Sequence, residues 1–327
     1  MQRSDPLLYA IDLPLTGSYY PAGFRLDIAT NSRDVLEAAA ESWGRYAQEF
    51  ECQPLQFRIV IQAHGELAPR PVYRKQRHLW SVVSDRDNHA GGDSETLFAS
   101  FFLSEKTARD HAWLRWFFVE AMAYALLSQR YVAPIHAACV ARQGAGILLC
   151  GESGAGKSTL SFACARAGWT FVADDGTLLL IHSEDRMAVG TPHKARFRDD
   201  APSIFPELAG YAVIARPNGK LSLEVPLDAF PQIRTASRCP IRAMAFLNRR
   251  TGERPRVERL RTGEAVDRLL RELPVYGPEV DALHEKAVRR LEGLPAWSLH
   301  YESLGDALGL LSEIMTDIGS RKVASHE

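Results

Sequence analysis

The sequence contains little that would set it apart from ordinary soluble globular proteins. Its cysteines are few and form no C-x-x-C pair; they are Cys52, Cys139, Cys150, Cys164 and Cys239. An odd, scattered set with apolar neighbours predicts reduced thiols in the core of a cytosolic protein. Internal repeats and low-complexity tracts are also missing.

Long hydrophobic runs and an excess of one charge are absent as well. No run approaches the length of a membrane span, and residues 1–20 lack the continuous apolar stretch of a signal peptide. The formal net charge is −1, so we expect neither nonspecific nucleic-acid binding nor membrane-surface binding. These features together predict a cytoplasmic protein.

Length and composition favour two domains. The 327 residues are 46% hydrophobic and 24% charged, as is typical of soluble globular chains. Residues 1–130 are predicted to form a smaller α+β domain, a candidate for substrate or partner recognition. Residues 131–327 are predicted to form an α/β domain.

Residues 1–130 carry a mixed pattern of strands and helices. Ser32 is predicted to cap a helix over 33–50, and residues 89–93, with two glycines, are predicted to form a loop. Ser104 begins a long helical pattern to residue 130 that is apolar on most faces, which indicates a buried helix. Strands are predicted at 7–13, 24–28, 55–61 and 78–84.

Residues 131–327 begin with two apolar runs joined by a short turn, which predicts a hairpin. Thr262, Pro278 and Ser303 indicate the starts of three helices. Strands are predicted at 135–141, 146–150, 170–173, 178–182, 221–225, 241–247 and 297–301.

Residues 151–158 read Gly-Glu-Ser-Gly-Ala-Gly-Lys-Ser, a complete G-x-x-x-x-G-K-[ST] phosphate-binding loop. Its glycines allow a tight turn that brings backbone N–H groups against phosphate oxygens. Lys157 supplies a charge for the β- and γ-phosphates, and Ser158 offers a hydroxyl to Mg²⁺. The predicted ATP-binding residues are Gly151, Glu152, Ser153, Gly154, Ala155, Gly156, Lys157, Ser158 and Thr159.

The flanks of the loop support the motif. Residues 146–150 before it form an apolar run of strand length. Residues 159–167 after it contain no Gly or Pro, and Gly168 stands where a helix C′ glycine belongs. Strand, loop and helix in this order predict a nucleoside triphosphate at the helix N-terminus.

Asp174 and Asp175 end the predicted strand at 170–173. As a neighbouring parallel strand, it would place both carboxylates at the sheet edge that holds the loop. Successive strand residues point to opposite faces, so one carboxylate would hold Mg²⁺ and the other would act as general base. The alternative is an exposed turn, where Asp is common. His136, by composition alone, is either a core or a catalytic histidine.

Three elements together resemble the catalytic domain of HPr serine kinase/phosphorylase. They are His136 with Ala-Ala-Cys-Val after it, the run 146–158, and the Ala-Asp-Asp sequence that ends at Asp175. The resemblance implies a P-loop kinase fold of the HPr kinase and phosphoenolpyruvate carboxykinase type in residues 131–327. It also implies that His136 and Asp175 are catalytic, with Asp175 as acid/base partner of an acceptor serine and Asp174 on the metal side.

The sequence departs from that family in three places. Thr159 stands where HPr kinases usually carry a glutamate, so the metal shell would differ. Residues 190–207 lack the family's glycine-rich signature, and residues 1–130 show no relation to the N-terminal domain of HPr kinase. The chain therefore resembles the HPr-kinase-related proteins of bacterial biosynthetic clusters more than it resembles true HPr kinase.

Arg196 and Arg198 flank Phe197 at strand spacing, so both can point to one face. Two guanidinium groups there would clamp triphosphate or transition-state charge. The alternative is a solvated basic edge. Lys220 and His193 are weaker candidates.

These features predict an ATP- and Mg²⁺-dependent kinase that transfers the γ-phosphate to a hydroxyl, in the first place of serine, in a protein, peptide or small molecule. One alternative is a regulatory switch that binds or hydrolyses ATP without an acceptor. Another is a carboxykinase for a small oxo acid, which would need a second nucleotide loop that the sequence does not show. The acceptor, the reverse reaction and homo-oligomer formation stay open.

Overall fold

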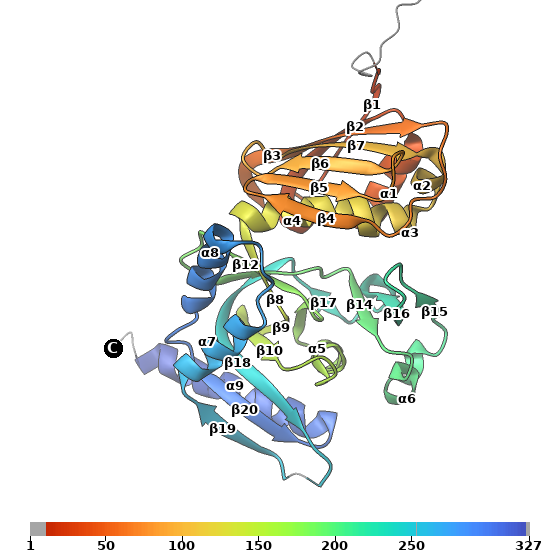
Figure 1. The fold of residues 1–327 in the computed structure, drawn as a ribbon. Helices are drawn as coiled ribbons and strands as arrows, with labels where there is room; N and C mark the ends of the chain where they lie inside the picture. Colours follow the sequence, from red (N-terminus) through yellow and green to blue (C-terminus); the bar gives the residue numbers. More distant parts are fainter. Residues whose placement is uncertain (1–10, 253, 325–327) are drawn as a thin grey trace, which may run out of the picture. The chain divides into compact units, whose positions relative to one another are not determined.

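The computed structural model describes residues 11–252 and 254–324 and divides the chain into two compact units, Met1–Arg130 and Tyr131–Glu327 (Figure 1). We call them unit 1 and unit 2. Both combine helices with sheets, which confirms the predicted mixed α/β class. Among the described helices, none is long and apolar enough to cross a membrane.

Unit 1 is built on a seven-stranded sheet in the order β1-β2-β3-β7-β6-β5-β4. β2, β3 and β7 are parallel neighbours, whereas β7, β6, β5 and β4 are antiparallel. Leu55, Phe57 and Ile59 alternate with exposed residues along β3, so one face of the sheet is buried. The strands are β1 (Leu15–Tyr19), β2 (Phe24–Thr30), β3 (Phe50–Gln62), β4 (Val72–Gln76), β5 (Leu79–Val83), β6 (His89–Asp93) and β7 (Phe98–Ser104).

The helices of unit 1 lie on one face of this sheet (Figure 1). The Ser104 hydroxyl caps the first of the later helices, accepting from the Thr107 N–H at 3.2 Å. The predicted single helix to Arg130 consists of several segments, because Asp110 caps a second start and a π-helical turn follows. The elements are η1 (Pro21–Gly23), α1 (Arg33–Trp43), α2 (Glu105–Arg109), α3 (His111–Leu114), η2 (Arg115–Val119) and α4 (Glu120–Arg130).

Two predictions for unit 1 are wrong, and a third is only partly testable. Residues 89–93 form strand β6 instead of a loop, paired with β5 and β7. A Cβ on Gly92 would lie 2.5 Å from Met122 Sδ, so this glycine serves packing under α4 rather than a turn. The helix predicted over 33–50 ends at Trp43, since Phe50 already belongs to β3. The strand predicted at 7–13 lies mostly outside the described residues.

Unit 2 has helices on both faces of a ten-stranded sheet (Figure 1). The main path is β17-β11-β9-β10-β18-β13-β12-β8, with β20 beside β18 and β19 beside β20. α5 and α9 pack on one face, through Leu160 and Leu311 among others. α7 and α8 pack on the other, through Val266 and Val288. The unit is therefore layered as helix, sheet and helix.

Unit 2 contains the ten-stranded sheet, a separate three-stranded sheet and several helices. The sheet strands are β8 (Val132–Ile135), β9 (Ala137–Arg142), β10 (Ala145–Cys150), β11 (Thr170–Ala173), β12 (Thr177–Leu180), β13 (Met187–Val189), β17 (Arg234–Thr235), β18 (Arg238–Arg249), β19 (Arg256–Leu260) and β20 (Ala296–Tyr301). A separate small sheet contains β14 (Lys194–Phe197), β16 (Leu221–Pro226) and β15 (Val213–Ala215). The helices are α5 (Lys157–Arg166), α6 (Ala201–Ile204), η3 (Pro206–Leu208), η4 (Leu227–Ala229), α7 (Thr262–Arg271), α8 (Pro278–Arg289) and α9 (Leu304–Ala324).

The strand predicted at 135–141 is two strands, interrupted at His136. β8 pairs with β12, whereas β9 pairs with β10 and β11. β11, which precedes the two aspartates, is also not beside β10 as predicted, because β9 lies between them and is antiparallel to both. β10 and β11 are therefore parallel to each other, and their C-terminal ends lie where β9 begins.

The predicted helix starts in unit 2 differ in their chemistry. Pro278 begins α8 as predicted. The Ser303 hydroxyl caps α9 by accepting from the Asp306 N–H at 3.1 Å. Thr262 is not a cap but the first residue of α7, and its hydroxyl donates to the Leu294 carbonyl at 3.2 Å.

Candidate functional site

The loop 151–156 joins the end of β10 to the start of α5. Gly151, Gly154 and Gly156 have φ angles of 154°, 93° and 94°, all in the region that favours glycine. A Cβ on Gly151 would lie 2.9 Å from the Ala155 Cβ. The curve of the loop therefore leaves no room for a side chain at position 151, which suits the close approach of phosphate oxygens.

Helix α5 begins at Lys157, so its first N–H groups face the loop. Its other end closes in a Schellman motif, in which the Trp169 N–H donates to Cys164 O and the Gly168 N–H donates to Ala165 O, both at 3.0 Å. Gly168 has a φ of 86°, as its predicted C′ position requires. The chain then enters β11, and the two aspartates follow this strand directly.

The Lys157 side chain is buried inside the loop, 4% exposed. Its ammonium donates to the carbonyls of Gly151 and Glu152, at 2.8 and 3.2 Å. Asp175 Oδ1 lies 3.5 Å from the same nitrogen. The P-loop lysine and the second aspartate therefore meet at one point.

The two aspartates have different surroundings. Asp174 is buried, and its Oδ2 accepts the Arg196 N–H at 2.7 Å. Burial raises the pKa of Asp174, against the opposing effect of the nearby Arg196 charge. The Asp175 side chain is 57% exposed and faces Lys157 and His136. One carboxyl is thus fixed in the protein and the other is accessible to solvent.

His136 lies between two carboxylates. Its Nε2 is 3.0 Å from Asp175 Oδ1, and its Nδ1 is 3.1 Å from Glu272 Oε2. The histidine reaches this edge because it stands at the break before β9, whose first residues lie beside the C-terminal ends of β10 and β11. The His136 side chain is 33% exposed, so it is not a core histidine, and its catalytic role stays a prediction.

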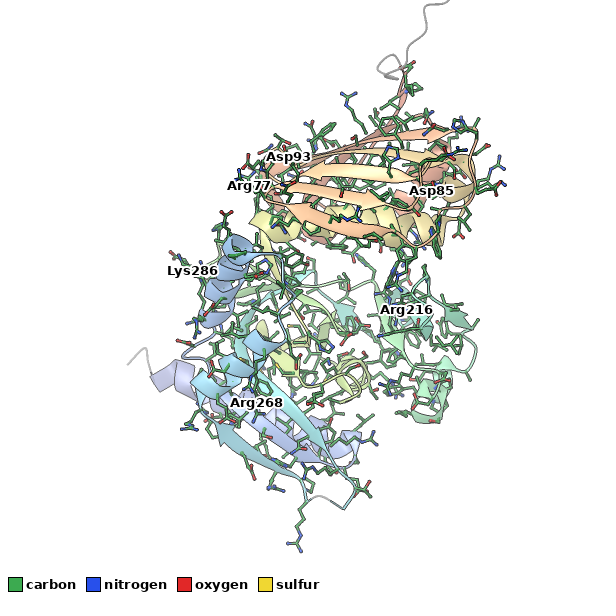
Figure 2. All side chains as sticks on the ribbon, in the orientation of Figure 1. Arg77, Asp85, Asp93, Arg216, Arg268 and Lys286 are labelled. Atoms are coloured by element: carbon green, nitrogen blue, oxygen red, sulfur yellow. The ribbon has the colours of Figure 1, made fainter. Side chains whose placement is uncertain are left out.

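Glu272 is the residue that sequence reasoning missed. It follows α7 directly, and in sequence it reads as an ordinary polar residue at a helix end. α7 is held on the sheet by Val266 and Leu269, and the Arg268 guanidinium, labelled in Figure 2, lies 5.3 Å from the Phe246 ring. Only the tertiary fold brings Glu272 to His136.

The side chains of Arg196 and Arg198 have different contacts. Arg196 Nε donates to Glu224 Oε1 on β16 at 2.7 Å. Burial would raise the pKa of Glu224, but attraction to Arg196 and Lys194 outweighs it and the pKa is lowered. Arg198 follows β14 and is exposed, and a Cβ on Gly154 would lie 2.9 Å from its Nη2. Arg198 therefore lies against the phosphate loop, whereas the Arg196 side chain is engaged by Glu224.

The donor set near the loop fits Mg²⁺ only together with phosphate. Ser158 and Asp174 offer the oxygen ligands that Mg²⁺ prefers. In the described residues, the cluster of three His, Cys, Asp or Glu ligands lies elsewhere, at Asp34, Glu37 and His111 of unit 1. An Mg²⁺ ion near the loop would thus take few protein ligands and complete its shell with phosphate oxygens and water, as is usual for this ion.

The sequence offers two weaker candidates, His193 and Lys220, whose backbones form hydrogen bonds away from the loop. The carbonyl of His193 accepts the Leu227 N–H at 3.0 Å. The Lys220 N–H donates to Asn218 Oδ1 at 3.1 Å in the turn between β15 and β16. Neither contact brings the side chain to the loop.

Comparisons with known proteins find a family model and solved structures that are similar to this chain. Residues 102–197 match the family model described as SynChlorMet cassette protein ScmC. A solved structure, the Hpr(Ser) kinase/phosphatase from Coxiella burnetii, matches over 59% of this chain and 96% of its own, at 14% identity and a TM-score of 0.32. No curated protein matches. The predicted resemblance to HPr-kinase-like proteins is thereby confirmed as a resemblance.

Proposed function

We propose that unit 2 is an ATP- and Mg²⁺-dependent kinase that transfers the γ-phosphate to a hydroxyl group. The observation that carries this proposal is the meeting of three groups at Asp175 Oδ1, with Lys157 Nζ at 3.5 Å and His136 Nε2 at 3.0 Å. A nucleotide switch needs the lysine to bind phosphate. It does not need a general base, the role that an accessible carboxylate in contact with a histidine can fill.

The phosphate side of the site would be formed by the loop. Its N–H groups and the α5 N-terminus would bind the β- and γ-phosphates, and Lys157 would turn from the loop carbonyls to the phosphate oxygens. Ser158 and Asp174 would hold Mg²⁺, which when bound neutralises charge on the phosphates. Arg198, beside Gly154, would offer a guanidinium to the transferred group.

The acceptor side would be formed by Asp175. Its carboxylate would take the hydroxyl proton while the acceptor oxygen bonds to the γ-phosphorus and the bond to the β-phosphate oxygen breaks. His136 would orient the carboxylate through Oδ1, and Glu272 would orient His136. Glu272 thus acts as a positioning residue, with no contact to the reacting atoms.

The test compares three proteins with radiolabelled ATP, using free serine and a set of serine-containing peptides as acceptors. Lys157→Ala should lose transfer while keeping its circular dichroism spectrum. Asp175→Asn should keep ATP binding and lose transfer about a hundredfold or more, the usual range for a missing general base. Wild-type rates in either folded variant would disprove the assignment. ATP hydrolysis without any labelled acceptor would favour the switch.

A further inference from the structure

β4 forms one edge of the unit 1 sheet, and no described strand lies beyond it. Its residues are exposed on both sides, except for the half-buried Lys75. The strand is joined to β5 by the two-residue turn Arg77 and His78, with Arg77 at a φ of 55°. This edge is long enough for an extended segment to pair with it.

The register determines which backbone groups of β4 point outward. The turn closes with Gln76 opposite Leu79, and the residues that flank a two-residue hairpin turn hydrogen-bond to each other through their backbones. Hydrogen-bonded and non-hydrogen-bonded pairs alternate in an antiparallel ladder, so Arg74 bonds inward to β5 and Tyr73 does not. The N–H and C=O of Tyr73 therefore point to the open side of the sheet.

The edge is also positively charged. Residues 67–84 contain Arg70, Arg74, Lys75 and Arg77 and no aspartate or glutamate. The three arginines are exposed, and within the described part of the chain none of them forms an ion pair. Arg77 is labelled at the end of the hairpin in Figure 2. The charge is thus available to a partner rather than consumed by the fold.

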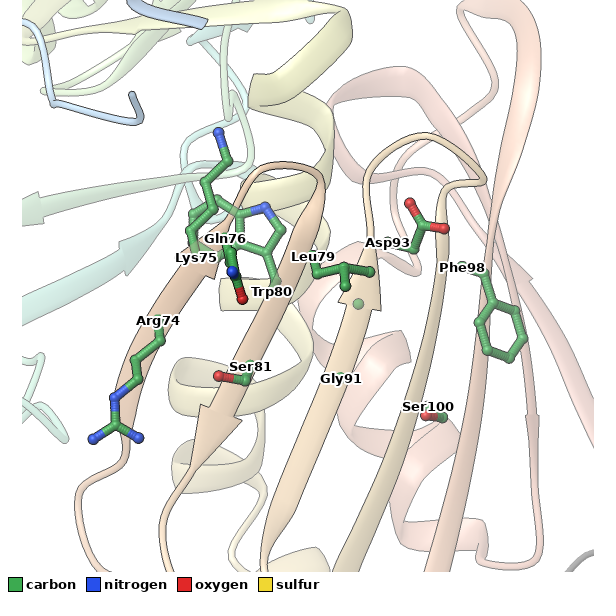
Figure 3. Close-up of a pocket in the computed structure, with 11 residues that line it drawn as sticks. Arg74, Lys75, Gln76, Leu79, Trp80, Ser81, Gly91, Asp93, Phe98 and Ser100 are labelled. Atoms are coloured by element: carbon green, nitrogen blue, oxygen red, sulfur yellow. The ribbon is translucent and has the colours of Figure 1, made fainter. Parts of the chain in front are cut away.

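A groove of about 740 Å³ lies beside this edge on the sheet face (Figure 3). Its floor is low because the register places Ser81, Gly91 and Ser100 side by side on β5, β6 and β7. Leu79 and Phe98 supply apolar walls. The groove also contains the carboxylate of Asp93. This carboxylate is directed to the turn between β6 and β7, where it accepts a hydrogen bond from the Glu95 N–H at 2.8 Å.

We propose that the β4 edge and this groove bind an extended, acidic peptide segment as an added strand. The backbone of the peptide would pair with Tyr73, and its acidic side chains would lie near Arg74 and Arg77. Apolar side chains on the groove side would contact Leu79. The proposal rests on the proposed function only in taking this segment to be part of the phosphoacceptor, so that unit 1 recognises what unit 2 phosphorylates.

Charge argues against a second copy of this chain at the same edge. Pairing β4 with β4 of another copy would bring Arg74 and Arg77 close to the same residues of the partner. Like charges opposite each other in a sheet are destabilising. An acidic segment removes that repulsion and gains from the same arginines.

The test measures binding without nucleotide, so it does not depend on kinase activity. The probe is a short fluorescein-labelled peptide of alternating glutamate and valine with one serine, followed by fluorescence anisotropy with the full chain. The same peptide with lysine in place of glutamate is the control. We expect the acidic peptide to bind and to weaken with salt, and the basic one not to bind. Lys157→Ala should bind as the wild type does.

Two pairs of variants test the geometry. Arg74→Glu should weaken binding about fivefold, as expected for replacing one exposed attraction by a repulsion, whereas Arg33→Glu at the start of helix α1, on the helix-covered face of the sheet, should change it little. Tyr73→Pro removes an outward N–H, and Tyr73→Ala removes the same ring but keeps the N–H. We expect about tenfold weaker binding for Tyr73→Pro than for Tyr73→Ala. Equal binding of both peptides, or equal binding of the two Tyr73 variants, would overturn the proposal, as would a salt-independent dimer that excludes the peptide.

Discussion

Replacing Glu272 by alanine should slow phosphoryl transfer while leaving ATP binding unchanged. The carboxylate contacts His136 Nδ1 at 3.1 Å, and His136 Nε2 contacts Asp175 Oδ1 at 3.0 Å. Without Glu272 the imidazole can rotate, and Asp175 loses the group that orients it. The loop proposed to bind phosphate does not include Glu272, so the effect should fall on kcat rather than on the affinity for ATP.

The size of the effect follows from the geometry and the exposure. A hydrogen bond to a charged group contributes about 1.5–3 kcal/mol when it is protected from water. The His136 and Glu272 side chains are 33% and 36% exposed. Solvent screening therefore reduces the expected loss to about 1–1.5 kcal/mol. That loss corresponds to a fall of roughly five- to twelvefold in kcat.

The assay compares initial rates of transfer, and the affinity for a fluorescent ATP analogue, across three variants. Glu272→Gln keeps an oxygen acceptor for Nδ1 and should retain most of the activity, whereas Glu272→Ala should not. Glu264→Ala, on the same helix and paired with Arg268, is the matched control. If Glu272→Ala transfers phosphate at the wild-type rate, or if its loss appears as weaker ATP binding, the positioning role is wrong.

Three further predictions concern stability and reactivity. A Cβ on Gly190 would lie 1.9 Å from the Val172 carbonyl oxygen, so Gly190→Ala should lower the free energy of unfolding, measured with urea, by about 1–3 kcal/mol. Gly210 has open space around it, so Gly210→Ala should leave this free energy unchanged. Burial lowers the pKa of His111, but contacts with Glu41 and Asp34 outweigh it and raise the pKa, so its contribution is full below the unfolded pKa and lost as pH rises through the folded one. His111→Gln should therefore lower Tm more at about pH 6 than at about pH 9, and an equal loss at both would contradict this. Cys52 is half-buried and the other cysteines are buried, so Cys52→Ser should remove the fast phase of thiol titration by an aromatic disulfide in the native protein.

The loop and its flanks were predictable because their signals are local. Consecutive residues specify the strand, the glycines at positive φ, the lysine, and the helix with its C′ glycine. The different burial of Asp174 and Asp175 is consistent with that local pattern, although both residues follow β11 instead of lying on it. The prediction of a loop at 89–93 was wrong because Gly92 is needed for close packing against Met122, which lies far away in the sequence. Composition alone could not distinguish a glycine needed for packing from one needed for a turn.

The contacts of His136 were not predictable from residue types. Its partners come from the turn after β11 and from the end of α7, which the fold brings together across 136 positions in the case of Glu272. The pairing of Arg196 with Glu224 is similar, since it depends on the register of β14 with β16. A pattern can nominate such residues, but only tertiary structure decides which of them meet.

The position of β9 explains how three separate motifs share one site. A strand antiparallel to both β10 and β11 begins where those strands end, so its first residues lie at the same sheet edge as the phosphate loop and the aspartates. His136 stands just before β9, at a break that lets its side chain leave the sheet plane. Had β8 and β9 formed one continuous strand, alternation would have fixed this side chain to one sheet face. The interruption at His136 is therefore a requirement of the proposed acceptor site, and substitutions that restore a continuous strand there should cost activity before they cost stability.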